Sequence, residues 1–126
     1  MKLVSIEQLH KDHVEWTSYV DHWKVEIRFL TNLLTKVYDK KFESLYGKEV
    51  KEQINTLDHH TRYLNEIAET INTHEAFMKD FMQTEHTRVN HQELLDHYKT
   101  RDRMLEFYKK FKLLKEKVFI LAEKFY

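Results

Sequence analysis

The chain of 126 residues contains no cysteine and no proline, and its only glycine is Gly47. Without cysteine it has no disulfides, no thiolate chemistry and no cysteine-based zinc or iron–sulfur site. A β protein needs turn-forming residues at every reversal, so the shortage of glycine and proline favours a few long helices. Because 33% of the residues are charged and 13% are aromatic, the composition is typical of a folded domain.

The sequence also lacks a net charge, an apolar N-terminal leader and any apolar run of membrane-spanning length. Its 21 acidic and 21 basic residues give a formal net charge of +0. We therefore expect a cytoplasmic protein that binds neither membranes nor nucleic acid. The basic stretch over residues 99–117 has few aromatic rings for base stacking, and we assign it to pairing with an acidic stretch over residues 52–85.

What the sequence does contain is helical periodicity. The apolar residues from Ile6 to Val37, with His13 in the one remaining position, recur at alternating steps of three and four residues, which places them on one face of a long helix. Ser5 and Gln8 match a capping box and predict where that helix begins. The same spacing over residues 50–82 and residues 104–125 predicts two further helices.

These patterns predict an all-α fold, a long antiparallel bundle of three helices running up, down and up, as a single domain over residues 1–126. The reversals are predicted at residues 39–47 and 87–90, and short connections make neighbouring helices antiparallel. A four-helix bundle is the alternative, because Asn72 and Glu75 match a second cap that would break the middle helix. The apolar spacing passes Asn72 without a change of phase, which favours one continuous helix.

Nine histidines are present, and the up-down-up order gathers several of them at one end. His13 occupies an apolar-face position in the first helix, and extending the third helix backwards from Met104 places His97 and Glu93 near the same level. The core is therefore expected to turn polar there. Since imidazole and carboxylate groups on facing helices bind iron, manganese or zinc, the candidate metal ligands are His10, His13, Glu93 and His97.

From the sequence alone, a structural interpretation of the same cluster is preferred, in which buried neutral imidazoles set the register of the bundle. Di-iron bundle proteins repeat the Glu-x-x-His pattern on two helices, whereas here it occurs once, at Glu7–His10. An iron or manganese ion would imply a redox or oxygen-handling role. No catalytic residues are predicted, because the sequence has no Gly-rich phosphate loop and no convincing Ser-His-Asp set, and we do not expect an enzyme.

The first and last predicted helices carry more apolar residues than one core face needs. The surplus residues are Val25, Phe29, Leu33, Phe119 and Ile120. Such a surplus predicts burial in a two-fold homodimer. The leading prediction of function is therefore a non-enzymatic interaction or scaffold protein that self-associates and presents a helical face to a protein partner. The alternative prediction is a small metal-binding bundle.

Overall fold

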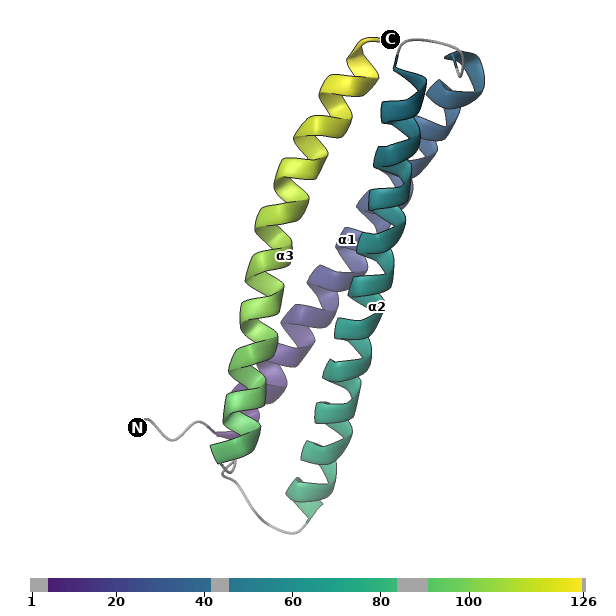
Figure 1. The fold of residues 1–126 in the computed structure, drawn as a ribbon. Helices are drawn as coiled ribbons and strands as arrows, with labels where there is room; N and C mark the ends of the chain where they lie inside the picture. The colour runs from purple at the N-terminus through teal and green to yellow at the C-terminus, as the bar shows by residue number, and fades with distance from the viewer. Residues whose placement is uncertain (1–4, 42–45, 84–90, 126) are drawn as a thin grey trace.

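The computed structural model describes residues 5–41, 46–83 and 91–125 and confirms the all-α prediction. The described residues form three helices, α1 (Ile6–Lys41), α2 (Gly47–Gln83) and α3 (His91–Glu123). With 36, 37 and 33 residues, each is about 50 Å long at the standard helical rise. In Figure 1, α1 climbs from the end that holds the N-terminus, α2 descends and α3 climbs again. The fold is thus an up-down-up three-helix bundle.

The predicted start of α1 and the predicted continuity of α2 are both confirmed. The backbone N–H of Gln8 donates to Ser5 Oγ at 3.2 Å, so the serine caps the first turn. The second helix begins at Gly47 and passes through Asn72 without interruption. The four-helix alternative is therefore wrong, because the buried face of α2 continues on both sides of Asn72 and the local capping pair does not overcome it.

The first predicted reversal overlaps the end of α1, and the second lies outside the described residues. The helix α1 extends to Lys41 and so enters the predicted reversal at residues 39–47, since Asp39, Lys40 and Lys41 include no helix-breaking residue. The predicted reversal at residues 87–90 lies outside the described residues. On its far side, α3 begins at His91, so the third predicted helix starts close to where the sequence placed it.

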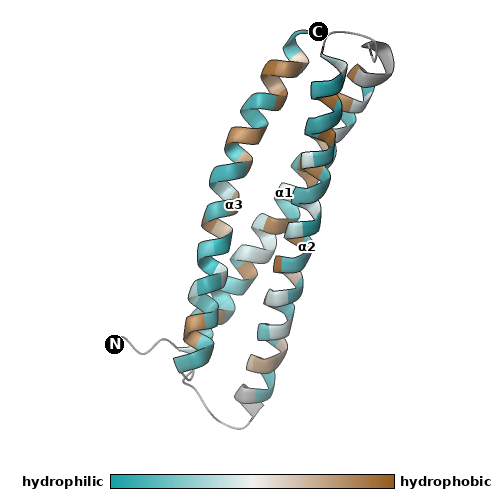
Figure 2. Ribbon diagram, in the orientation of Figure 1, coloured by the Kyte–Doolittle hydropathy of each residue, from teal (hydrophilic) through white to brown (hydrophobic). Residues whose placement is uncertain are grey.

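The buried faces of the three helices form one apolar core that runs along most of the bundle. Figure 2 shows hydrophobic residues recurring along each helix between hydrophilic stretches. The largest fully buried side chains of this core include Phe111, Leu30, Leu34, Leu57, Leu64 and Ile67. Because burial of each such side chain is worth roughly 1.5–3 kcal/mol, the apolar periodicity is what holds the helices together.

Near the end where α1 begins, the core changes from apolar to polar. His13, His97 and Thr100 are the buried polar side chains among the described residues. They lie between the main core and a small apolar cluster of Ile6, Leu9 and Met78. The prediction that the core turns polar at this end is therefore confirmed.

Charged side chains of α3 pair with both neighbouring helices. The guanidinium of Arg103 lies 5.0 Å from the ring centroid of Tyr63 and 3.9 Å from the carboxylate of Glu66, both on α2. Lys115 forms an ion pair at 2.8 Å with Glu26 of α1. The sequence had predicted pairing with the second helix alone.

None of the helices, over the ranges described, combines the length and apolar character needed to cross a membrane.

Candidate functional site

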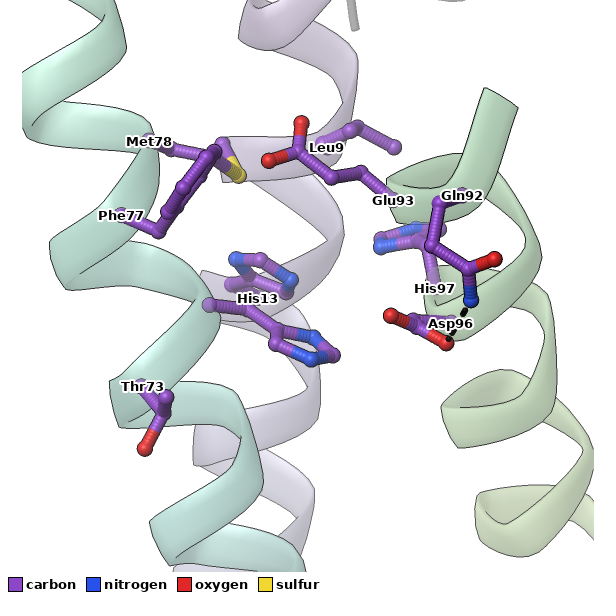
Figure 3. Close-up of a pocket in the computed structure, with 10 residues that line it drawn as sticks. Leu9, His13, Thr73, Phe77, Met78, Gln92, Glu93, Asp96 and His97 are labelled. Carbon is purple, nitrogen blue, oxygen red and sulfur yellow. Dashed lines mark hydrogen bonds between the residues drawn. The ribbon is translucent and has the colours of Figure 1, made fainter. Parts of the chain in front are cut away.

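A pocket of about 350 Å³ lies beside the polar layer and is termed the histidine pocket. It is lined by Leu9, His13, Thr73, His74, Phe77, Met78, Gln92, Glu93, Asp96 and His97. Figure 3 shows His13 contributed by α1 and His97 by α3, with Phe77 and Met78 on α2 across from them. All three helices therefore build the pocket, and its walls combine imidazole and carboxyl groups with apolar side chains.

The ring of His13 is fixed in the pocket by a carboxylate. His13 is only 2% exposed, and its Nδ1 lies 2.7 Å from Oε2 of Glu75 on α2. Because an ionised carboxylate only accepts hydrogen bonds, Nδ1 carries the proton and donates it. In the tautomer with its single proton on Nδ1, the ring keeps a lone pair on Nε2. No group among the described residues hydrogen-bonds to that nitrogen.

His97 repeats this arrangement with the opposite ring nitrogen. It is 3% exposed, and its Nε2 lies 2.9 Å from Oδ2 of Asp12 on α1. The lone pair of neutral His97 is therefore on Nδ1, which also lacks a hydrogen-bond partner in the part of the chain that the structure describes. The rings of His13 and His97 have centroids 5.2 Å apart, and Trp16 stacks on His97 at 4.5 Å.

Glu75 joins a surface histidine to the buried one. One carboxylate oxygen of Glu75 accepts from Nδ1 of His10 and the other from Nδ1 of His13. Burial acts to raise the pKa of Glu75, but the hydrogen bonds from His13 and His10 outweigh it and hold this pKa below its usual value. The carboxylate is therefore ionised at neutral pH, as the proton assignment on His13 requires.

Three other titratable groups of the pocket, His74, Glu93 and His97, have pKa values that are shifted towards their neutral forms. Burial is the main cause that lowers the pKa of His97 and of His74. Burial also raises the pKa of Glu93, and the negative charge of Asp96 adds to the effect. Desolvation disfavours the charged state of each of these groups. Burial therefore favours the uncharged imidazole form of His74 and His97.

Imidazoles held in this way are suited to bind a metal ion. In protein metal sites, a ligating histidine commonly donates its other ring N–H to a carboxylate, which fixes the tautomer and raises the basicity of the ligand. Zn–N bonds are about 2.0–2.1 Å and the ring centre lies about 1.2 Å further on, so two imidazoles on a tetrahedral ion have centroids about 5 Å apart. The rings of His13 and His97 already have this separation.

A third ligand is not yet in place beside these two nitrogens. Across the described residues, no group of three His, Cys, Asp or Glu side chains is already arranged to hold an ion. Glu93 lies on the pocket wall next to His97 on the same helix, and Figure 3 shows its carboxylate directed inwards from α3.

The structure brings together three of the four predicted metal ligands. His13, Glu93 and His97 line the pocket, whereas His10 does not. The side chain of His10 is 52% exposed and lies beyond Glu75, so it supports the site indirectly through that carboxylate. Its assignment as a direct ligand remains a prediction that the geometry does not favour.

Sequence reasoning missed the groups that hold and flank the two histidines. Glu75 gave one signal, because it occupies a position on the buried face of α2 where an apolar residue is expected. Asp12 and Asp96 gave no signal in the sequence, since each simply precedes a histidine on its helix. His74 also gave no signal, because it lies beside the predicted apolar face and not on it.

The residues predicted to mediate self-association are mostly on the outside of the bundle. Val25, Phe29, Phe119 and Ile120 are 45–60% exposed, whereas Leu33 is half-buried. Four of the five side chains therefore take little part in the core of a single chain.

The chain matches no protein-family model, and no curated protein or solved structure shows significant similarity to it. The function is therefore inferred from the geometry of the described residues.

Proposed function

We propose that this chain is a non-enzymatic, metal-binding helical bundle whose histidine pocket holds one transition-metal ion. The observation that carries the proposal is the pair His13 and His97. Each ring is buried, is held by a carboxylate through one nitrogen and has no hydrogen-bond partner for the other nitrogen among the described residues. Leaving a buried acceptor unpaired costs about 1–3 kcal/mol, and a bound cation removes that cost at both rings.

Glu93 is the third ligand in this proposal. Burial holds its carboxyl towards the neutral form, but a cation reverses this preference, because the charge of the ion stabilises the carboxylate. Nitrogen and carboxylate ligands together suit iron, manganese or zinc. Zinc would make the site structural, whereas iron or manganese would support a redox or oxygen-handling role.

Elemental analysis of untagged protein, purified without chelator or added metal, tests the proposal. We expect near-stoichiometric iron, manganese or zinc in the wild-type protein. The double variant His13→Ala/His97→Ala should lose the metal, whereas the matched variant His22→Ala/His59→Ala, which removes two exposed histidines, should retain it. Circular dichroism of both variants verifies that the helices remain folded.

Two results contradict the proposal. The first is wild-type protein that stays metal-free after dialysis against each of the three ions. The second is metal content that falls equally in the two double variants, because binding would then come from surface histidines. Either result would support the structural interpretation, in which His13 and His97 form a polar layer that sets the register of the bundle. Water would then hydrogen-bond to the two ring nitrogens.

A second candidate function is a self-associating interaction or scaffold protein. It is favoured by the exposure of Val25, Phe29, Phe119 and Ile120, since solvent-exposed aromatic and aliphatic side chains of this size are common in protein interfaces. The formal net charge of +0 means that two copies do not repel each other electrostatically. The two functions are compatible, because the histidine pocket does not include any of these residues.

A further inference from the structure

A second row of side chains runs along α1 beside its buried face and has the spacing of a helix-packing surface. Its residues recur at steps of three and four, which keeps them on one side of the helix. This outer row of α1 consists of Asp12, Glu15, Tyr19, His22, Glu26, Phe29 and Leu33. Because Tyr19 and Phe29 are 48% and 60% exposed, the row brings large apolar side chains to the surface of the bundle.

The helix α3 has an outer row with the same steps. This outer row of α3 consists of Tyr98, Arg101, Leu105, Tyr108, Lys112, Lys115 and Phe119. Leu105, Tyr108 and Phe119 are 45–53% exposed. Each of the two helices therefore carries a second row spaced for helix packing, and the large apolar side chains of that row are about half exposed in a single chain.

The two outer rows border the contact between α1 and α3. Lys115 of one row forms an ion pair at 2.8 Å with Glu26 of the other, and Asp12 lies 2.9 Å from His97 of α3. The rows therefore lie side by side on one face of the bundle, which is termed the α1–α3 face. In Figure 1 both helices climb in the same direction, so these two contacts also match residues of α1 and α3 by level.

The formal charges of the two rows are opposite. The charged residues are Asp12, Glu15 and Glu26 in the outer row of α1, and Arg101, Lys112 and Lys115 in that of α3. Counting from the two contacts between the helices places Glu15 close to the level of Arg101. The guanidinium of Arg101 lies 4.9 Å from the ring centroid of Tyr98, which holds it on the outer row. An acidic row and a basic row attract each other across an interface.

We propose that the α1–α3 face binds the same face of a second copy of this chain, with α1 of each copy packed on α3 of the other. This inference rests on the self-association put forward as the second candidate function, and it specifies the surface and the orientation. Three of the five residues that the sequence assigns to self-association, Phe29, Leu33 and Phe119, belong to the two outer rows.

The charges select one orientation of the two copies. A two-fold axis parallel to the helices keeps the copies parallel and places each acidic row on the basic row of the other copy at the same level. A two-fold axis across the helices would place α1 on α1 and bring the two acidic rows together, which electrostatic repulsion disfavours. The parallel arrangement forms the contact between Glu15 and Arg101 twice, because the interface is symmetric.

The α1–α3 face is large enough for a stable dimer. The outer row of α1 is about 32 Å long at 1.5 Å per residue. Two neighbouring helices whose axes are 8–10 Å apart present a width of about 20 Å. The face therefore covers roughly 600 Å² in projection, and the relief of its side chains adds to this area. That size is comparable with the 800 Å² or so that each partner contributes to a standard interface.

Charge reversal tests the orientation, with the molecular mass of the full chain measured by light scattering and sedimentation across a concentration series. We expect a dimer for the wild-type protein at micromolar concentration. Glu15→Arg and Arg101→Glu each set like charges against one another at two symmetric contacts, so each should weaken the dimer by about tenfold or more. An equimolar mixture of the two variants should recover the dimer, because both contacts then again join an acid and a base.

The matched control reverses an acidic and a basic residue on α2. Glu69→Arg and Arg62→Glu make the same changes of charge at exposed positions outside the α1–α3 face. These variants should dimerise like the wild-type protein, both alone and mixed. A general effect of net charge would instead change all four variants alike.

The outcomes separate this inference from self-association itself. A wild-type protein that stays monomeric contradicts self-association, and this inference fails with it. A dimer that withstands both Glu15→Arg and Arg101→Glu leaves self-association standing but overturns the α1–α3 face as its interface. Weakening by both variants without recovery in the mixture overturns the proposed orientation, and so does an equal response of the control variants. The metal content is a separate measurement, because Glu15 and Arg101 do not line the histidine pocket.

Discussion

His13 and His97 face each other across the end of the bundle with ring centroids 5.2 Å apart, and they are fixed through opposite ring nitrogens. Glu75 accepts from Nδ1 of His13 and Asp12 from Nε2 of His97. Each carboxylate comes from a different helix from the histidine that it holds. The pair thus ties all three helices together, and the second nitrogen of each ring has no hydrogen-bond partner among the described residues.

This arrangement makes the two tautomers measurable. We expect His13 to carry its proton on Nδ1 and His97 on Nε2 in chelator-treated protein above neutral pH, because each carboxylate only accepts. Long-range proton–nitrogen NMR correlations distinguish the two tautomers directly. Glu75→Gln removes the obligate acceptor and should mix the tautomers of His13 while leaving His97 unchanged. Identical tautomers on both rings in the wild-type protein would contradict the hydrogen bonds on which the metal site depends.

The shifted histidines make the stability of the bundle sensitive to acid. Burial lowers the pKa of folded His97, His74 and His60 from the ordinary value of 6.5, so the unfolded chain binds protons more readily. The free energy of unfolding should therefore be constant above about pH 7.5 and fall as the pH drops through 6.5 towards the folded pKa values. Urea denaturation with chelator present, at several pH values, measures this slope.

A matched pair of variants measures how much of that pH slope comes from His97. His97→Leu removes a buried titrating group and should flatten the dependence between pH 7.5 and 5, whereas His22→Leu removes an exposed histidine and should leave most of it. Equal slopes in His97→Leu and the wild-type protein would mean that burial of His97 does not contribute to acid sensitivity.

The core makes a sharper prediction about two adjacent residues of α3. Leu114 is 6% exposed and Leu113 is 61% exposed. We expect Leu114→Ala to lower the free energy of unfolding by roughly 2–5 kcal/mol, because it leaves a cavity in the core. Leu113→Ala should change it by less than about 0.5 kcal/mol. Urea denaturation at pH 7.5 compares the two, and similar losses would mean that Leu113 is buried in solution, as in an assembly of several copies.

Much of this fold was predictable, because the information lies in periodic positions. Apolar residues at alternating steps of three and four gave three helices and their buried faces, and the same count placed His13 and His97 at one level. The partners of these histidines were not predictable in the same way. Asp12, the partner of His97, lies off the buried face, and its role depends on side-chain directions that spacing does not encode. The end of α1 was missed for a related reason, since residues 39–41 are neutral towards helix formation.

Self-association is tested by adding charge to the outer faces of α1 and α3. If the exposed apolar residues form a dimer interface, Phe29→Glu and Ile120→Lys should each weaken the dimer, because an unpaired charge is then buried. Light scattering across a concentration series measures the molecular mass, and circular dichroism verifies the fold. A wild-type protein that stays monomeric throughout the micromolar range would remove the dimer from consideration, whatever the variants do.

Trp16 provides an internal reporter of the proposed ion, since its ring lies 4.5 Å from that of His97 and 5.6 Å from that of His13. In the variant Trp23→Phe, Trp16 is the only tryptophan left of two. We expect Co²⁺ to quench most of its fluorescence, because a paramagnetic ion on the two imidazoles is almost in contact with the indole.

The reciprocal variant Trp16→Phe supplies the control for this measurement. It leaves Trp23, which lies two helical turns further along α1, about 10 Å away at 1.5 Å per residue. Quenching of Trp23 should be clearly weaker, and it should vanish for Trp16 when His13→Ala/His97→Ala is added. Equal quenching of the two tryptophans, or quenching that survives loss of both histidines, would place the cobalt on the surface. Quenching confined to Trp16 and dependent on both histidines would locate the ion between α1 and α3, where the available ring nitrogens lie.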